Sequence, residues 1–161
     1  MTAARDRQPE LLRLLDQQIG AATTLLGILK TEREALNARD LESLSRSGDL
    51  KHRCLAELDA LDTDRRQLAE LIGLPADRVE FDDFLSTLLE RDPMRIRWQR
   101  LMGLLEQCRD LNEANGRLVA LQRHHVQQAL TVLRGADLDT QLYGPDGSPA
   151  FLSGGLPISS A

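Results

Sequence analysis

The sequence contains few aromatic residues, only two cysteines and an excess of acidic over basic residues. Aromatic residues make up 3% of the 161 residues, which disfavours a β-sheet core, because sheets are enriched in aromatic and β-branched side chains. Cys54 and Cys108 cannot form a framework of several disulfides, and both fall at helical core spacings. We therefore interpret them as small buried hydrophobic residues. The formal net charge of −5 excludes a generally basic surface for nucleic acid.

The sequence also lacks a membrane-spanning segment and the common catalytic motifs. No apolar run approaches the roughly 20 residues that cross a bilayer, and Arg13 and Asp16 interrupt the N-terminal apolar segment, unlike a signal peptide. The chain has no glycine-rich phosphate loop and no Cys-x-x-Cys pair. His124 and His125 are adjacent, so on a helix they point about 100° apart and cannot share a metal ion. We expect a cytoplasmic protein that is not an enzyme and needs no cofactor.

Leucine is abundant, and its spacing predicts long helices. Over residues 9–37 the apolar residues recur in alternating steps of three and four, which places one apolar stripe on one helix face. Leu11, Leu14 and Leu25 widen this stripe beyond a strict coiled-coil seam, which favours packing in a bundle. Pro9 suits the first helical turn. The seam comprises Leu12, Leu15, Ile19, Ala22, Leu26, Leu29, Arg33 and Leu36.

A second helix is predicted over residues 40–72. Asp40 is a good N-cap after a stretch without large apolar side chains, so we place a tight helix–helix turn immediately before it. The alternative is one continuous helix over residues 9–72, about 95 Å long. Gly73 followed by Pro75 ends the second helix. Its apolar seam is interrupted at three positions, Ser47, Lys51 and Arg65.

After a loop at residues 74–80, the spacing of Phe81, Phe84, Leu85 and Leu88 predicts one short helix. Asp92–Pro93 is a helix start, with Asp as N-cap and Pro at the first position, and opens a third long helix over residues 93–134. We therefore expect an all-α fold: an antiparallel bundle of three long helices plus one short helix over residues 1–134. Residues 135–161 contain five Gly and three Pro among scattered apolar residues, which indicates an irregular, flexible recognition tail.

The third helix becomes polar in the middle of its seam, at Asn112, Asn115 and Gln122. A buried Asn at a helix interface can fix the register by hydrogen bonding across it. Alternatively, this face is open and meets a partner protein. Gly116 costs roughly 1 kcal/mol relative to Ala in a helix. A close helix approach, a local bend or simple tolerance would each explain it.

The order of several motifs resembles the FlgN family of flagellar export chaperones, over nearly the whole chain. The motifs are Arg97-Trp98-Gln99, Asn112-x-x-Asn115-Gly116-x-Leu118, Leu142-Tyr143-Gly144-x-x-Gly147 and Gly154-Gly155-x-x-Ile158. The sequence departs from the family pattern near its end. The family pattern has basic residues after the paired glycines, whereas this chain has Leu156-Pro157 and no basic residue there. No role of a basic tail is therefore carried over.

The resemblance implies a cytoplasmic chaperone of the flagellar type III export system. Its clients would be the two hook–filament junction proteins, FlgK and FlgL, held by the last helix and the adjoining tail. Tyr143 would dock to the cytoplasmic domain of the export-gate protein FlhA. Covering the amphipathic segments of the clients would prevent premature association. The client-binding face would comprise Leu118, Val119, Leu121, Val126, Ala129, Leu130 and Leu133.

An alternative function is a self-associating structural coiled-coil protein, because the apolar seams would also serve a homo-oligomer. The tail argues against this alternative, since an apolar segment with Tyr143 has no role in a simple coiled coil. The two functions are compatible if the client-free chaperone covers its client face by forming a homo-oligomer.

Overall fold

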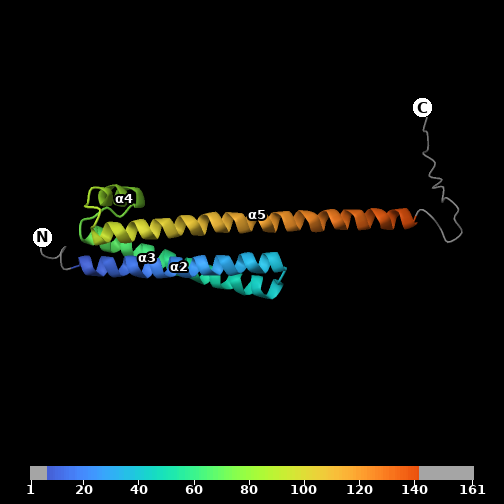
Figure 1. Ribbon diagram of the computed structural model, residues 1–161, viewed down its shortest axis with the longest axis horizontal. Helices are drawn as coiled ribbons and strands as arrows, with labels where there is room; N and C mark the ends of the chain where they lie inside the picture. The colour runs from blue at the N-terminus through green and yellow to red at the C-terminus, as the bar shows by residue number, and fades with distance from the viewer. Residues whose placement is uncertain (1–6, 142–161) are drawn as a thin grey trace, which may run out of the picture. The chain divides into compact units, whose positions relative to one another are not determined.

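The computed structural model describes residues 7–141 of the chain, and the side chains up to residue 134. These residues form helices and no strand, which confirms the predicted all-α fold (Figure 1). The chain divides into two compact units, Met1–Val119 and Ala120–Ala161, and each is described by itself. The helices are α2 (Gln8–Ala38), α3 (Leu41–Leu71), α4 (Arg78–Ser86) and α5 (Pro93–Gln141).

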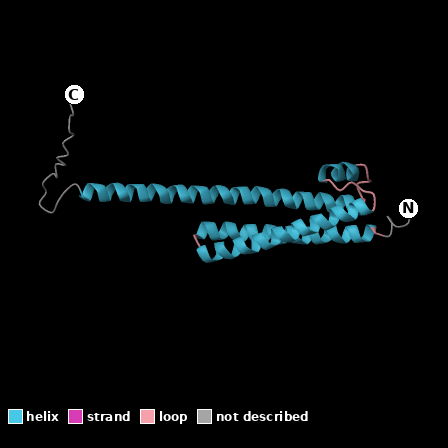
Figure 2. Ribbon diagram, turned by 180° about the vertical axis from the view of Figure 1, so that it is seen from behind, coloured by secondary structure: helices cyan, strands magenta, loops and turns pink. Residues whose placement is uncertain are grey.

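Helices α2 and α3 form a tight antiparallel hairpin, which confirms the predicted turn and shows that the continuous-helix alternative is wrong (Figure 2). The carboxylate of Asp40 caps α3 by accepting a hydrogen bond from the backbone amide of Ser43 at 3.1 Å. Arg39 adopts the left-handed conformation, with φ at 55°. The amide of Asp40 then donates to the carbonyl of Ala35 at 2.9 Å, which reverses the chain within two residues.

The connection from α3 to α4 begins as predicted but is shorter. Gly73 has a φ of 77°, and the amide of Leu74 donates to the carbonyl of Ala69 at 2.8 Å, so the glycine ends α3. The predicted loop over residues 74–80 is wrong in its last part, because α4 starts at Arg78. The physical reason is Asp77, whose carboxylate accepts hydrogen bonds from the first free amides of the helix.

Helix α5 starts at Pro93, as predicted, and Asp92 caps it by accepting from the amide of Met94 at 2.8 Å. In the first unit α5 runs parallel to α2, because their contacts advance together along both helices. The beginning of α5 is therefore the third long helix of the bundle and packs beside the α2–α3 hairpin (Figure 1). The paired residues are Arg97 with Asp16, Cys108 with Ala22, and Asn115 with Leu29.

The predicted end of the last helix at Arg134 is wrong, since α5 continues to Gln141. Gly135 does not stop it, because one glycine costs only about 1 kcal/mol and the next proline is Pro145. Residues 142–161 lie outside the described range. That residues 135–161 act as a recognition tail stays a prediction.

The apolar stripe predicted for α2 forms the centre of the bundle core. Both cysteines are buried and free, as predicted, and each thiol donates to a carbonyl of α2: Cys54 to Ala21 at 3.2 Å and Cys108 to Ala22 at 3.5 Å. Burial raises the pKa of both thiols, so the reactive thiolate is disfavoured. The large apolar side chains of α2 that are buried are Leu11, Leu14, Leu15, Ile19, Leu25, Leu29 and Leu36.

Arg65 is the main surprise of the core, because it interrupts the apolar seam of α3 and yet is fully buried. Its guanidinium lies over the rings of Phe81 and Trp98, 4.9 and 5.1 Å from their centroids. It also donates to the carboxylate of Asp62 and the carbonyl of Ala76. Arg65 therefore links α3, α4 and α5 through stacking and hydrogen bonds together.

Candidate functional site

The most exposed apolar surface of the second unit lies on α5. Most residues predicted to bind the client are exposed, for example Val126 at 59% and Leu130 at 47%, while Leu118, in the first unit, is half-buried. Contiguous exposed apolar side chains are typical of a protein-binding surface. The other exposed members of the predicted set are Val119, Leu121, Ala129 and Leu133.

Helical geometry shows which of these residues share a face. Val126, Ala129, Leu130 and Leu133 are separated by three, four and seven residues, so they form one stripe. We call these four residues the α5 face. Leu121 precedes Leu130 by nine residues, or two and a half turns, and therefore lies on the opposite side of the helix. There it joins Val132, which is 71% exposed and was not among the predicted client-binding residues.

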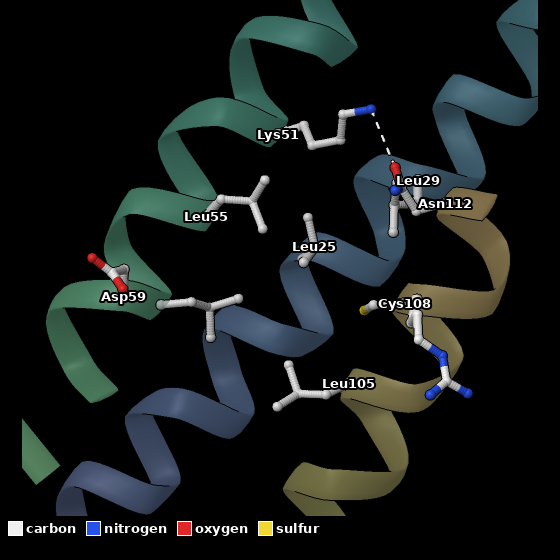
Figure 3. Close-up of a pocket in the computed structure, with 10 residues that line it drawn as sticks. Leu25, Leu29, Lys51, Leu55, Asp59, Leu105, Cys108 and Asn112 are labelled. Carbon is white, nitrogen blue, oxygen red and sulfur yellow. Dashed lines mark hydrogen bonds between the residues drawn. The ribbon is translucent and has the colours of Figure 1, made fainter. Parts of the chain in front are cut away.

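A second candidate surface is a groove of about 640 Å³ in the first unit, bounded by α2, α3 and α5. Figure 3 shows Leu25 of α2 between the side chains of α3 and α5. Leu55 of α3, which lines the groove, is 48% exposed. Its lining comprises Leu25, Leu29, Lys51, Leu55, Leu58, Asp59, Leu105, Cys108, Arg109 and Asn112.

One end of the groove is closed by a polar cluster that joins all three long helices. Glu32 of α2 accepts from Lys51 of α3 at 2.6 Å and from the Nδ2 of Asn115 of α5 at 2.8 Å. Asn115 Nδ2 also donates to the carbonyl of Leu29 at 2.9 Å. Lys51 Nζ lies 3.5 Å from Asn112 Oδ1, as the dashed line in Figure 3 marks. We call these residues the Glu32 cluster.

The cluster separates the two interpretations of the seam asparagines. Asn115 is 2% exposed and fixes the register between α2 and α5, as the first interpretation predicts. Asn112 is exposed, and among the described residues its side-chain contact is the long one with Lys51, at 3.5 Å. Gly116 is not required by a close approach, since a Cβ at this position would meet no atom within 4 Å. Of the explanations given above, a close helix approach is therefore wrong, whereas simple tolerance of a glycine in the helix agrees with the structure.

The predicted export-gate residue Tyr143 and the motif residues Leu142, Gly144 and Gly147 lie outside the described residues. The structure therefore does not place them. Their assigned roles stay predictions that rest on the resemblance.

The groove carries three reactive groups among its apolar side chains: the amine of Lys51, the carboxylate of Asp59 and the thiol of Cys108. The thiol of Cys108 donates to a carbonyl, and burial raises its pKa, so the reactive thiolate is disfavoured. Within residues 7–134 no cluster of three His, Cys, Asp or Glu side chains could hold a metal ion. Among the described helices none is both long and apolar enough to cross a membrane.

Comparison with known proteins gives consistent matches along the chain. Residues 1–150 match the model of the family described as FlgN protein. The flagella synthesis protein FlgN of Salmonella typhimurium is 32% identical over 152 residues, covering 92% of this chain and 97% of that protein. Its counterpart in Proteus mirabilis is 30% identical over 141 residues, covering 86% and 88%. A crystal structure of a FlgN protein from Pseudomonas aeruginosa matches with a TM-score of 0.60 and 28% identity, covering 70% of this chain and 88% of that chain.

Proposed function

The chain belongs to the FlgN family, and from this membership we propose that it is a cytoplasmic chaperone of flagellar export. It binds the hook–filament junction proteins FlgK and FlgL before their secretion, prevents their premature association and delivers them to the export gate. The observation that carries the proposal is the exposed α5 face. The relatives are named flagella synthesis proteins, which supports the same process.

The physics of the α5 face fits such a role. An amphipathic segment of an unassembled client exposes apolar surface, which promotes association with the wrong partner. A helix with an apolar stripe covers that surface by helix–helix packing, since both partners bury apolar area. Val126, Leu130 and Leu133 offer large side chains at the spacing of consecutive helical turns. This mode of action needs no nucleotide, because release can follow from competition at the export gate.

The first experiment replaces Leu130 by Asp and measures the affinity for purified FlgK and FlgL by calorimetry. We expect the helical content to stay unchanged and the affinity to fall by about thirtyfold or more, because the complex would bury an unpaired carboxylate at about 2 kcal/mol or more. The matched control is Gln128→Asp, which adds the same charge on the other side of α5. Equal affinities of Leu130→Asp and wild type would remove the α5 face from the client site.

The second experiment tests the delivery step through Tyr143→Ala. We expect this variant to keep its affinity for FlgK and FlgL and to lose binding to the cytoplasmic domain of FlhA, measured by co-purification with each protein. Tyr143→Phe is the conservative control, since it retains the ring and removes only the hydroxyl. If Tyr143→Ala loses client and FlhA to the same extent, the tyrosine belongs to the client site instead.

A further inference from the structure

The part of α5 that carries the α5 face has an unusual charge distribution. Residues 114–136 include three arginines and two histidines but contain no Asp or Glu, although the whole chain has a formal net charge of −5. The nearest acidic residues in sequence are Glu113 and Asp137. An apolar helix face within a purely basic segment is therefore distinct from the rest of this acidic protein.

Two of the arginines flank the α5 face on the same edge. Arg123 and Arg134 are eleven residues apart, which is close to three full turns, so they point in nearly the same direction. Both lie at the angular position next to Leu130 and are exposed. The third arginine, Arg117, lies in the first unit, where its guanidinium contacts the carboxylate of Glu113 at 4.0 Å.

The spacing of this arginine pair sets a distance. At a rise of about 1.5 Å per residue, eleven residues separate the two Cα atoms by about 16 Å along the helix axis. Within the described side chains, neither Arg123 nor Arg134 forms an ion pair with a carboxylate. Two exposed guanidinium groups beside an apolar stripe are thus available to a partner that carries negative charge at matching positions.

We infer that the segment docking on the α5 face is an amphipathic helix whose apolar stripe is flanked on one edge by two carboxylates about 16 Å apart. The inference rests on the proposed function and specifies the chemistry of the client segment. The apolar stripe provides the burial of surface, and the two charge pairs select the partner and its register. Specificity thus comes from the edge of the face and affinity from its centre.

The same charges disfavour a second copy of this chain as the occupant. If two copies of the α5 face packed antiparallel about their midpoint, Arg123 of one copy would lie within about one helical turn of Arg134 of the other. Like charges in such flanking positions destabilise a helix pair. A basic edge therefore acts against self-pairing while it attracts an acidic partner.

The test uses the full-length chain and two synthetic amphipathic helical peptides with the same apolar stripe. One peptide carries Glu at two edge positions eleven residues apart, and the other carries Lys there. Fluorescence anisotropy at low and at physiological salt gives the dissociation constants. We expect the Glu peptide to bind the wild-type chain about tenfold more tightly at low salt, with a smaller preference at higher salt, because two exposed ion pairs replace two repulsions.

The variants decide whether this edge is responsible. Arg123→Glu combined with Arg134→Glu should abolish or reverse the preference for the Glu peptide, whereas Arg117→Glu should retain it. Circular dichroism of each variant checks that the helix is intact. Equal affinities for the two peptides, no binding of either peptide, or the same preference in the double variant would each overturn the inference.

The failure of this inference is distinguishable from failure of the proposed function. FlgK and FlgL that bind the wild type, lose affinity with Leu130→Asp and are unaffected by the double arginine variant would leave the chaperone proposal supported and refute the charged edge. If neither junction protein binds the wild-type chain, the proposed clients are wrong, and the peptide preference still decides the chemistry of the surface.

Discussion

Replacing Asn115 by Ala tests whether the polar middle of α5 is structural. Asn115 is buried and donates through one Nδ2 group to the carboxylate of Glu32 and to the carbonyl of Leu29. A hydrogen bond to a charged group contributes about 1.5–3 kcal/mol, and a neutral one about 0.5–1.5 kcal/mol. Asn115 Oδ1 is buried and accepts no hydrogen bond from the described residues, which costs free energy in the folded state. Removing this atom therefore offsets about 1 kcal/mol of the stability lost with the two hydrogen bonds.

The balance predicts that Asn115→Ala lowers the free energy of unfolding by about 2 kcal/mol. For a chain of this size, this corresponds to a melting temperature lower by about 6 °C. The matched control is Asn112→Ala, three residues earlier in α5, because Asn112 is exposed and its contact with Lys51 is long. We expect this control to change the free energy of unfolding by less than about 0.5 kcal/mol.

Urea denaturation followed by circular dichroism at 222 nm measures both values, and calorimetric titration with FlgK and FlgL measures binding. We expect Asn115→Ala to weaken the bundle and to keep its affinity for the clients at temperatures where it is folded. If Asn115→Ala is as stable as wild type but binds the clients more weakly, the asparagine faces a partner, and the register interpretation is refuted.

Two further predictions concern residues that break a local rule. Arg65→Ala should lower the free energy of unfolding by about 3 kcal/mol, because it removes a stacked guanidinium and leaves the carbonyl of Ala76 unpaired. Urea denaturation measures this loss, and Arg66→Ala, at a more exposed arginine, is the control. An effect of Arg65→Ala no larger than that of the control would contradict this role. Arg39→Gly should raise the free energy of unfolding by about 1 kcal/mol, since glycine adopts the left-handed conformation without the steric strain of arginine. Thermal unfolding measures the change, and a lower melting temperature would argue against strain at Arg39.

The ends of α2 and α3 show which turns can be predicted from the residue type at the turn itself. Gly73 has the conformation that only glycine adopts easily, so the end of α3 was predictable from one residue. The end of α2 has the same left-handed conformation at Arg39, where the residue type carries no such signal. That turn was predictable from the N-cap at Asp40, which belongs to the next helix, together with the lack of large apolar side chains just before it.

The candidate site was predictable in part, because some of its features depend on one helix alone. The stripe of Val126, Leu130 and Leu133 follows from helical periodicity, which is a property of one helix. Leu121 was assigned to the same face from the family resemblance, but nine residues place it on the opposite side of α5 from Leu130. The groove could not be predicted, because its lining comes from three helices that are distant in sequence.

The sequence by itself determined the order of the helices and the starts of α3 and α5, because caps, prolines and apolar spacing act within a few residues of one another. Only the tertiary structure decided which polar residues are buried. Arg65 and Asn115 interrupt apolar seams in the same way as Lys51 and Asn112, yet the first two are buried and the last two are more accessible. The difference depends on which aromatic ring, carboxylate or carbonyl a neighbouring helix brings opposite each side chain, and that partner is distant in sequence.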